Sequence, residues 1–583
     1  MNLYVGLCPQ KNQRQERAGS GGLAKSLWKG NDDLVAGLGA LIVKCDAVFG
    51  NYMNTFTRNN YIGIIVIIVL LVGAVWLADR YRNDNDQSGA SRQSVKLFSS
   101  ETAGLTDAVS MPTIELQDGD TYELVAQQVK KNINGQEVKM LGYNGSVPGP
   151  FIKVKQGSEI TVNFTNNTDV ETTLHSHGVR VDNAFDGIPG ITQDPIPVGG
   201  SFTYRLKFPD AGMYWYHPHI REDYAQELGL YGNFLVEPQD TAYWSPVNRE
   251  VPLVLDDILL ENGRVAPFAE NESSHTLMGR FGNTMLVNGD TEFQLDAQPG
   301  EVVRFFLTNT ANTRTFNVSI PGANLKMVGS DGGAYEQETF VDSVVISPSE
   351  RATVDVLFES AGTYPLQHST PLKTYSLGSV VVNGVTVAPS YAAQFATAAV
   401  NESVRLEINA FRPLLARAID KSLNIGIDMG MMNMMSGPAV GHGQHATHGG
   451  GQPIEWEDDM PAMNIHSTKE TVQWKLTDEA TGRSNMDIDW KFKLGDKVKI
   501  KITNDRNSMH PMQHPIHLHG QRFLVTSTNG VPNDNLVWKD TALVQTGDTV
   551  ELLVDMTNPG DWMLHCHIAE HLEDGMMLPF TVI

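Results

Sequence analysis

The stretch GSEITVNFTN, residues 157–166, begins with glycine and ends with Thr-Asn, and it recurs twice along the chain. The other versions are GEVVRFFLTN at 300–309 and GDKVKIKITN at 495–504. Between the landmarks apolar and polar residues alternate, which is typical of a strand with one buried face. Each copy has a later landmark, with the sequences AGMYWYHPH (211–219), AGTYPLQHS (361–369) and PGDWMLHCH (559–567). Because helical periodicity is scarce, the repeat predicts an all-β fold of three β-sandwich domains of common ancestry.

The repeat and the segments before it divide the chain of 583 residues into consecutive parts. The three sandwiches are expected at 111–240, 241–390 and 391–583, and the last carries a Met/His-rich insertion at 427–451. Residues 79–110 are polar and rich in Ser, Asp and Asn, the composition of a tether. Residues 1–60 are expected in the cytoplasm. Met53, which precedes the sequence NTFTRNN, is a candidate start of translation.

An apolar segment, YIGIIVIIVLLVGAVWLA at 61–78, carries no charge over 18 positions. As a helix it spans roughly 27 Å, just enough for the hydrocarbon layer of a bilayer. Charged residues follow directly, with no small-residue cleavage site, so an uncleaved single-pass anchor is favoured over a removed signal peptide. Seven Lys and Arg precede it and four lie in 80–96. This bias favours an anchor in a bacterial inner membrane, with the body in the periplasm or outside the cell.

Charge and cysteine content narrow the possible functions. The net charge of −24 is not offset by a basic stripe, which excludes nucleic-acid binding. Only 3 cysteines occur, and Cys8 and Cys45 precede the apolar segment. Cys566 is therefore alone in the body, which cannot form an internal disulfide. Its thiol is interpreted as a ligand or a nucleophile.

Histidines follow the repeat in four His-x-His pairs, two in the first copy and two in the third. The pairs are His175 and His177, His217 and His219, His517 and His519, and His565 and His567. The second copy has Asn317-Val-Ser319 and Gln367-His368-Ser369 in their place. Chance histidines would not respect the repeat, so the pattern predicts one site shared between the first and third domains.

The spacing of these pairs suits a metal site. Alternate residues on a strand point to the same side, so each pair can present two imidazoles in one direction, and copper and zinc both suit imidazole. Cys566 lies between His565 and His567, and its side chain points the opposite way. With His514, His571 and a weak axial Met576, it makes the set typical of a blue-copper electron-transfer centre. Zinc is disfavoured because methionine is a poor ligand for it.

The motifs HSHG, HPH, HPIHLHG and HCHIAEHLEDGM resemble the four copper signatures of multicopper oxidases, the family of laccases, ascorbate oxidase and bacterial cuprous oxidases. The resemblance covers roughly residues 112–583. It implies cupredoxin-like, Greek-key domains, four copper ions and reduction of O₂ to water, with one-electron transfers passing from the type 1 copper through Cys566 to the cluster. The expected chain is a monomer.

The resemblance also assigns roles by motif. His514, Cys566, His571 and Met576 resemble the ligands of the type 1 copper. His175 and His517 resemble ligands of the type 2 copper. The ligands of the type 3 pair are then His177, His217, His219, His519, His565 and His567.

Proton supply to O₂ needs acids near the cluster. Asp186, in FDGIPG, resembles the acid that the family keeps near the three-copper site. The second family acid lies at positions that are Leu572 and Ala569 here. Glu570 and Glu573 are therefore the tentative substitutes, and Asp574 is a third possibility.

The reductant is predicted from the insertion, IDMGMMNMMSGPAVGHGQHATHGGG at 427–451. Thioethers are soft ligands that select Cu(I), and a His-rich tract also suits metal. The segment resembles the Met-rich segments of bacterial cuprous oxidases involved in copper tolerance, and Met460, Met463, Met509 and Met512 add sulfurs near the type 1 motif. The candidate Cu(I) ligands are Met429, Met431, Met432, Met434, Met435, His442, His445 and His448.

Other functions stay open. The insertion is also consistent with a flexible loop over the substrate pocket of a laccase that oxidises phenols. A non-catalytic copper-binding cupredoxin protein is a further alternative, which the complete set of ligands disfavours. Copper nitrite reductase is a further possibility by fold. It lacks a type 3 pair, whereas the four His-x-His pairs supply one here. The expected partners are O₂ and either Cu(I) or a phenolic reductant.

Overall fold

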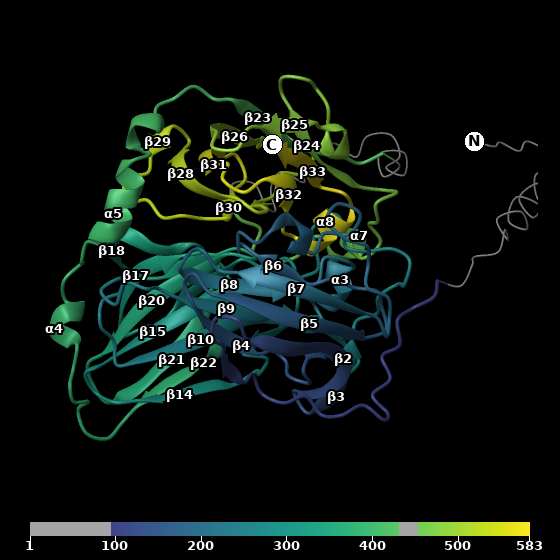
Figure 1. Cartoon of the computed structure of the whole chain (residues 1–583). Coiled ribbons are helices and arrows are strands. Elements are labelled where there is room, and N and C mark those ends of the chain that lie inside the picture. The colour runs from purple at the N-terminus through teal and green to yellow at the C-terminus, as the bar shows by residue number, and fades with distance from the viewer. Residues whose placement is uncertain (1–94, 431–452) are drawn as a thin grey trace, which may run out of the picture. The chain divides into compact units, whose positions relative to one another are not determined.

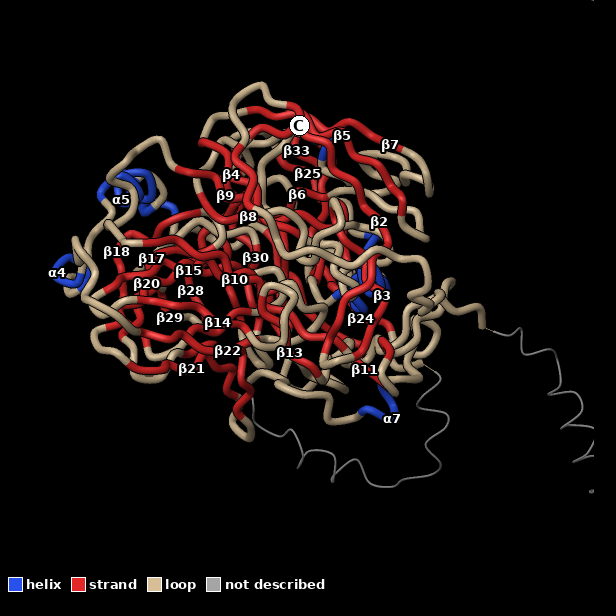
Figure 2. Tube along the Cα trace, turned by 90° about the horizontal axis from the view of Figure 1, so that it is seen from below, coloured by secondary structure: helices blue, strands red, loops and turns tan. Residues whose placement is uncertain are grey.

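Three pairs of sheets make up the part of the chain that this computed structural model describes, residues 95–430 and 453–583 (Figure 1). The fold is mostly β, and the helices of the described residues are short and lie between strands or at the edges (Figure 2). These helices are α3 (Glu222–Ala225), α4 (Ala392–Phe395), α5 (Glu402–Asn409), α7 (Pro461–Asn464) and α8 (Ala569–Glu573).

The first pair of sheets corresponds to the first predicted domain. One sheet has the order β3-β2-β5-β7 and the other β1-β4-β9-β8-β6. The strands of the first sheet are β2 (Thr121–Ile133), β3 (Gln136–Tyr143), β5 (Glu159–Asn167) and β7 (Ser201–Lys207). Those of the second are β1 (Thr113–Glu115), β4 (Phe151–Lys155), β6 (His175–His177), β8 (Gly212–His217) and β9 (Gly232–Glu237).

The middle domain pairs the sheet β13-β10-β15-β20-β17-β18 with the sheet β14-β22-β21-β16-β19. The strands of the first are β10 (Arg249–Ile258), β13 (Thr284–Val287), β15 (Glu301–Asn309), β17 (Asn324–Ser330), β18 (Gly333–Val341) and β20 (Arg351–Phe358). Those of the second are β14 (Phe293–Ala297), β16 (Phe316–Ser319), β19 (Val344–Ile346), β21 (Gly362–Ser369) and β22 (Thr374–Val382). A short hairpin, β11 (Leu260–Glu261) and β12 (Arg264–Val265), stands apart.

The third domain repeats this plan with the sheets β24-β23-β26-β31-β28-β29 and β25-β33-β32-β27-β30. The strands of the first are β23 (Lys421–Asp428), β24 (Gln473–Asp478), β26 (Lys497–Asn504), β28 (Arg522–Thr528), β29 (Val531–Pro532) and β31 (Thr549–Asp555). Those of the second are β25 (Trp490–Phe492), β27 (His514–Leu518), β30 (Thr541–Val544), β32 (Gly560–Cys566) and β33 (Met577–Val582).

The three predicted repeat strands, β5, β15 and β26, occupy the same place in each domain. Each pairs in parallel with an earlier strand, β2, β10 or β23. Each also pairs antiparallel with a later one, β7, β20 or β31. The sequence repeat is therefore a repeat of topology.

The asparagine that ends each repeat has the same structural role in all three domains. The side-chain amide of Asn166 donates to Val170 O at 2.9 Å and to Ile196 O at 3.0 Å. Asn309 donates to the carbonyls of Arg314 and Ile346 at 2.8 and 2.9 Å, and Asn504 to those of Met512 and Val544 at 2.6 and 3.2 Å. Each amide is buried and ties two loops to the end of a central strand, which is why the repeat ends in asparagine.

Each domain has its own apolar core, with two departures from the predicted boundaries. Leu277, Met278 and Phe281, which fall within 241–390, pack in the core of the third domain. Residues 95 to 110, predicted as tether, also contact the body: Phe98 stacks on Tyr224 with ring centroids 3.8 Å apart. The other predicted domain boundaries stay predictions.

No helix within residues 95–430 and 453–583 is long and apolar enough to cross a bilayer. The predicted anchor at 61–78 lies outside the described residues, as do most of the predicted insertion and the candidate start at Met53.

We expect Asn309→Ala to lower the free energy of unfolding of the metal-free protein by about 2–3 kcal/mol, since it strands two buried carbonyls. The measurement is urea unfolding followed by tryptophan fluorescence. Asn324→Ala is the control, because this exposed asparagine makes only one side-chain contact, to Glu359 at 3.4 Å, and should change stability by less than about 0.5 kcal/mol. Equal effects of the two substitutions would contradict the role given to the repeat asparagine.

Candidate copper centres

Two strands of the first domain bring the first four histidines together. In the antiparallel pair of β6 and β8, His175 lies opposite His217 and His177 lies opposite Trp215. His219 follows two residues after the end of β8. All four imidazoles are buried. The alternation along β6 is thus the one that the His-x-His spacing predicts.

The third domain repeats the arrangement with β27 and β32. His517 lies opposite His565, and His519 and His567 each follow directly after the end of a strand. Cys566, between the two histidines of β32, is fully buried and packs in the core of the third domain. In the middle domain, Ser319 and Gln367 occupy the facing positions on β16 and β21, so no pair of imidazoles forms there.

The first and third domains share their histidines, as the sequence predicts. Ligand atoms that lie within 4.8 Å of one another define three groups in this cluster: His175, His177 and His517; His177, His217 and His567; and His219, His519 and His565. Each group mixes residues from both domains. The six predicted type 3 ligands divide into the last two groups, and both predicted type 2 ligands belong to the first.

Hydrogen bonds orient five of these imidazoles. Each donates through Nδ1 to a fixed oxygen: His175 to Asp186 O, His217 to Pro218 O, His517 to Asp540 O, His565 to Cys566 O and His519 to Asp186 Oδ2, at 2.7 to 3.0 Å. Nε2 of His175, His217, His219 and His517 is buried without a partner. The Nε2 atoms of His519 and His565 face each other at 2.9 Å, and since both rings donate through Nδ1, both atoms present lone pairs. The cluster fits metal cations.

The imidazoles are held neutral, as metal ligands must be. Burial, together with the neighbouring histidines, lowers the pKa of His217 and His565 well below the usual value, and the same holds for His177, His219, His517 and His567. Burial lowers the pKa of His519 to about 4. Proton competition for these nitrogens is therefore weak near neutral pH.

A fourth group, separate from the cluster, contains the predicted type 1 ligands. Cys566 Sγ lies 3.5 Å from His514 Nδ1 and 3.8 Å from His571 Nδ1. Met576 is buried in the same core, and its backbone O accepts a hydrogen bond from Cys566 N at 3.1 Å. Trp474 packs against the rings of His514 and His571, with centroids 4.5 and 4.7 Å away. Two imidazoles, a thiol and a nearby methionine suit copper better than zinc.

Cys566 connects the two centres. Burial raises its pKa, so the sulfur stays protonated unless a bound cation displaces the proton. Its neighbours in sequence, His565 and His567, belong to two different groups of the cluster. The mononuclear site and the cluster are thus joined by a few covalent bonds.

Among the predicted acids, Asp186 contacts the cluster directly. Its Oδ2 accepts from His519 at 3.0 Å, and its Oδ1 lies 3.4 Å from His175 Nδ1. Burial raises its pKa, but the two histidines outweigh burial, and the net pKa is below the usual range. Asp186 is therefore a carboxylate that orients two rings.

Glu570 and Glu573 lie further from the histidines. Glu570 accepts hydrogen bonds from Asn312 and Thr313 at 3.1 Å each, and Glu573 accepts one from the backbone N of Glu222 at 2.9 Å. Burial raises the pKa of each carboxyl to about 7. Within the described residues neither carboxylate forms a hydrogen bond or ion pair with a histidine, so their role in proton supply stays a prediction.

Sequence reasoning missed Glu222, the first residue of α3. Its fully buried carboxylate lies 3.3 Å from His219 Nδ1 and 4.0 Å from His217 Nδ1. Burial, with Glu573 and Asp223 nearby, raises its pKa well above the usual value. The signal was its position three residues after His219, in the turn that leads from β8 into α3.

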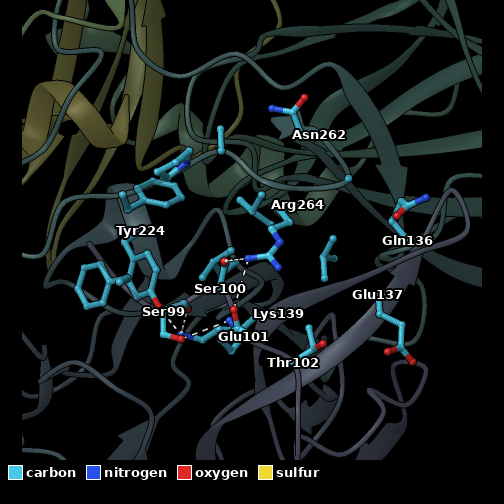
Figure 3. A pocket seen from close by; sticks show the side chains of 18 residues that line it. Ser99, Ser100, Glu101, Thr102, Gln136, Glu137, Lys139, Tyr224, Asn262 and Arg264 are labelled. Carbon is cyan, nitrogen blue, oxygen red and sulfur yellow. Dashed lines mark hydrogen bonds and ion pairs between the residues drawn. The ribbon is translucent and has the colours of Figure 1, made fainter. Parts of the chain in front are cut away.

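Of the predicted Cu(I) ligands, only Met429 lies in the described residues; the other seven, from Met431 to His448, do not. Met429 is partly buried and packs on the core of the third domain with Met460. A cavity of about 250 Å³ lies elsewhere, between segment 98–102, Lys139, Tyr224 and Arg264 (Figure 3). None of its lining residues is a predicted copper ligand.

Comparison with known proteins places the chain in a family. Profiles described as multicopper oxidase match residues 124–241, 250–388 and 455–583, one in each domain. The chain belongs to the multicopper oxidase family. It is accordingly a copper-dependent oxidoreductase that uses O₂ as acceptor, with four coppers as cofactors: one type 1, one type 2 and two type 3.

The relatives have several names. Multicopper oxidase MmcO of Mycobacterium tuberculosis is 27% identical over 488 residues, 78% of this chain and 86% of the relative. A copper resistance protein A homolog of Pseudomonas syringae pv. tomato is 24% identical, covering 79% and 91%. A solved multicopper oxidase from Campylobacter jejuni, described as a metallo-oxidase, is 25% identical with a TM-score of 0.62 and covers 84% of this chain and 98% of that one.

Acid should destabilise the metal-free protein. The pKa of His519 is lowered to about 4 and that of His514 to about 3, whereas an unfolded histidine titrates near 6.5. The unfolded chain therefore binds more protons below about pH 6.5, so stability is complete above that pH and is lost as pH falls toward 4. We expect urea midpoints of the metal-free protein to fall steeply over this interval.

Copper should oppose this loss, because a bound cation competes with protons for the same nitrogens. The copper-loaded protein should therefore keep its urea midpoint to a lower pH than the metal-free protein. Superimposable pH profiles of the two forms would show that the buried histidines do not hold copper.

Proposed function

We propose that this multicopper oxidase oxidises Cu(I), coupling four one-electron oxidations to the reduction of O₂, and that it serves copper tolerance. The balanced reaction is 4 Cu(I) + O₂ + 4 H⁺ → 4 Cu(II) + 2 H₂O. The observation that carries the proposal is a thioether beside an imidazole close to the type 1 ligands: His510 Nε2 lies 2.9 Å from Met278 Sδ.

The two donors come from different predicted domains, Met278 from 241–390 and His510 from 391–583. Met278 is buried in the core that also holds Cys566, and its backbone N donates to Asn464 Oδ1 at 3.0 Å. His510 is half-buried, four residues before His514. Its neighbour Met509 is 58% exposed, so the donor pair lies close to solvent. We propose that a cation from solution reaches the pair at the half-buried ring of His510, since Met278 itself is buried.

Trp474 lies between the donor pair and the type 1 ligands. Its ring centroid is 6.1 Å from His510, and the same ring packs on His514 and His571. Trp474 Nε1 donates to Thr276 O at 2.9 Å, which fixes the indole. Copper ions held by the pair and by the type 1 ligands would be separated by this one indole, whose hydrogen bond holds it in place.

The chemistry of the pair favours reduced copper. Thioether sulfur selects Cu(I) over Cu(II), and imidazole suits both. Burial lowers the pKa of His510 to about 4, so its ring is neutral at physiological pH and free to bind a cation. The net charge of −24 also attracts cations to the protein.

The coppers, when bound, supply the electron transfers and the chemistry of O₂. The protein residues bind and orient them: the Nδ1 hydrogen bonds aim the imidazoles, burial excludes bulk water, and Asp186 and Glu222 place carboxylates beside the cluster. We propose that Glu222, Glu570 and Glu573 supply protons and that Asp186, which is ionised, passes them to the cluster.

The names of two relatives support the choice of substrate. One is a copper resistance protein A homolog and another is a metallo-oxidase. A laccase-type phenol oxidase is the alternative, since Laccase-1 of Botryotinia fuckeliana is 27% identical over 79% of this chain and 81% of that protein. The cavity of Figure 3 does not favour this alternative, because it contains none of the type 1 ligands.

Met278→Leu should raise the KM for Cu(I) about ten-fold or more while leaving the oxidation of a phenolic dye nearly unchanged, since it removes a thioether but keeps the packing. The measurement is O₂ consumption by the copper-loaded protein with each substrate. Met285→Leu, at a buried methionine of the middle-domain core, is the matched control and should change neither KM. An unchanged KM for Cu(I) in Met278→Leu would reject the donor pair as the entry site.

We also propose that residues 61–78 anchor the chain in a bacterial inner membrane with the body in the periplasm. Cys8 and Cys45 precede the segment, and Cys566 is buried, so thiol labelling reports orientation. The full chain should resist carbonate extraction, and an impermeant maleimide should label it only after the membrane is permeabilised. Labelling in intact spheroplasts would reverse the proposed orientation.

A further inference from the structure

The middle domain supplies a buried arginine to the junction of all three domains. Arg351, the first residue of β20, pairs with both carboxylate oxygens of Asp540 in the third domain; the bond to Oδ1 is 2.8 Å. Its Nε donates to Met213 O in the first domain at 2.9 Å. The guanidinium also donates to Ser349 O at 2.8 Å, and the backbone N of Arg351 donates to Asp331 Oδ1 of its own domain at 2.8 Å. The guanidinium thus joins backbone or carboxylate groups from three sandwiches.

Asp540 connects this junction to the cluster. Its Oδ1 lies 3.0 Å from His177 Nε2, and its backbone O accepts from His517 Nδ1 at 2.9 Å. The hydroxyl of the next residue, Thr541, lies 3.2 Å from His177 Nε2 and 3.3 Å from His517 Nδ1. With Nε2 so engaged, Nδ1 of His177 is buried without a partner. One aspartate therefore faces a ring from each of the two histidine-bearing domains.

The junction leaves no spare room, which explains the glycine of the HSHG motif. Gly178 has a φ of +80°, and a Cβ there would lie 2.2 Å from Asp540 Oδ2 and 2.8 Å from an Arg351 nitrogen. A side chain would push the ion pair away from the histidines. The motif therefore ends in glycine so that this pair can approach His177.

Removing one partner of such a pair is costly. Both side chains are almost completely excluded from solvent, and a buried carboxylate left without its cation must move, take up a proton or draw in water. Any of these changes would release the rings that Asp540 orients. A bidentate arginine also fixes the carboxylate plane, which a lysine does not.

We propose that Arg351 is a positioning residue for the three-copper cluster: it holds Asp540, which in turn orients His177 and His517. The middle domain has no paired histidines, yet it contributes to the centre through this contact. The inference rests on the four-copper assignment and is independent of which reductant the enzyme uses.

The test compares Arg351→Met with Arg304→Met. Arg304 is an equally buried arginine of the middle domain that pairs with Asp355 at 2.8 and 2.9 Å, and its contacts include none of the cluster histidines. Both variants lose a buried bidentate ion pair, so both lose stability. Only Arg351→Met removes a contact to Asp540, the residue that faces His177 and His517.

Copper retention against a chelator and the electron paramagnetic resonance spectrum of the type 2 copper are the readouts. Arg351→Met should lose cluster copper at about ten- to hundred-fold lower chelator concentration, the usual effect of removing a group that orients a ligand, while keeping the thiolate-to-copper absorption of the type 1 site. Arg304→Met should keep four coppers and the wild-type spectrum. Equal losses in the two variants, or wild-type retention in Arg351→Met, would overturn the proposal.

Arg351→Lys covers the case in which Arg351→Met does not fold. Lysine keeps the charge but not the fixed fork of donors, so the protein should bind four coppers with altered hyperfine splitting at the type 2 site. A wild-type spectrum in this variant would show that Arg351 only stabilises the fold.

Discussion

Each imidazole of the copper cluster must be buried, neutral and aimed: burial lowers the pKa of the rings and so keeps them neutral, and the hydrogen bonds at Nδ1 aim them. Five rings donate to backbone or carboxylate oxygens. For His217 and His565 the acceptor is the carbonyl oxygen of the next residue in the sequence. Neutral rings then turn their other nitrogen to the centre. The strand register, the short loops after β8 and β32, and the contact between the outer domains serve to hold those oxygens in place.

The three sandwich domains contribute unequally to holding the copper ligands. The outer copies keep the paired histidines, while the middle copy has Ser319 and Gln367 in the facing positions. All three keep the buried asparagine that ties two loops to the central strand. Loss of the metal ligands therefore left the folding constraints of the middle copy intact, and its surface became a support for the other two.

Much of this arrangement could be predicted from sequence because it depends on local periodicity. The Thr-Asn landmarks predicted three sandwiches, and the spacing of the His-x-His pairs predicted rings on one side of each strand. What sequence could not provide were contacts between segments far apart in the chain. Asp540 meets His177 across 363 positions, Met278 joins a core formed mainly by the third domain, and the six type 3 ligands separate into two triads only once the outer domains meet.

The acidic residues show the same limit of sequence-based prediction. Family positions pointed to the segment after Cys566, but Glu570 and Glu573 face α3 and the middle domain. The carboxylate beside His219 comes instead from Glu222, in a different domain.

Complete burial of the ligands has a consequence for how the enzyme matures. The four histidines on β6 and β27 and the thiol of Cys566 are essentially inaccessible to solvent once the outer domains are in contact. Metal for the shared cluster is therefore expected to arrive while the two outer sandwiches are still apart, or during a transient parting of them. Once bound, the ions would cross-link the first and third domains. They would take the place of the disulfides that these domains, with a single cysteine, cannot make.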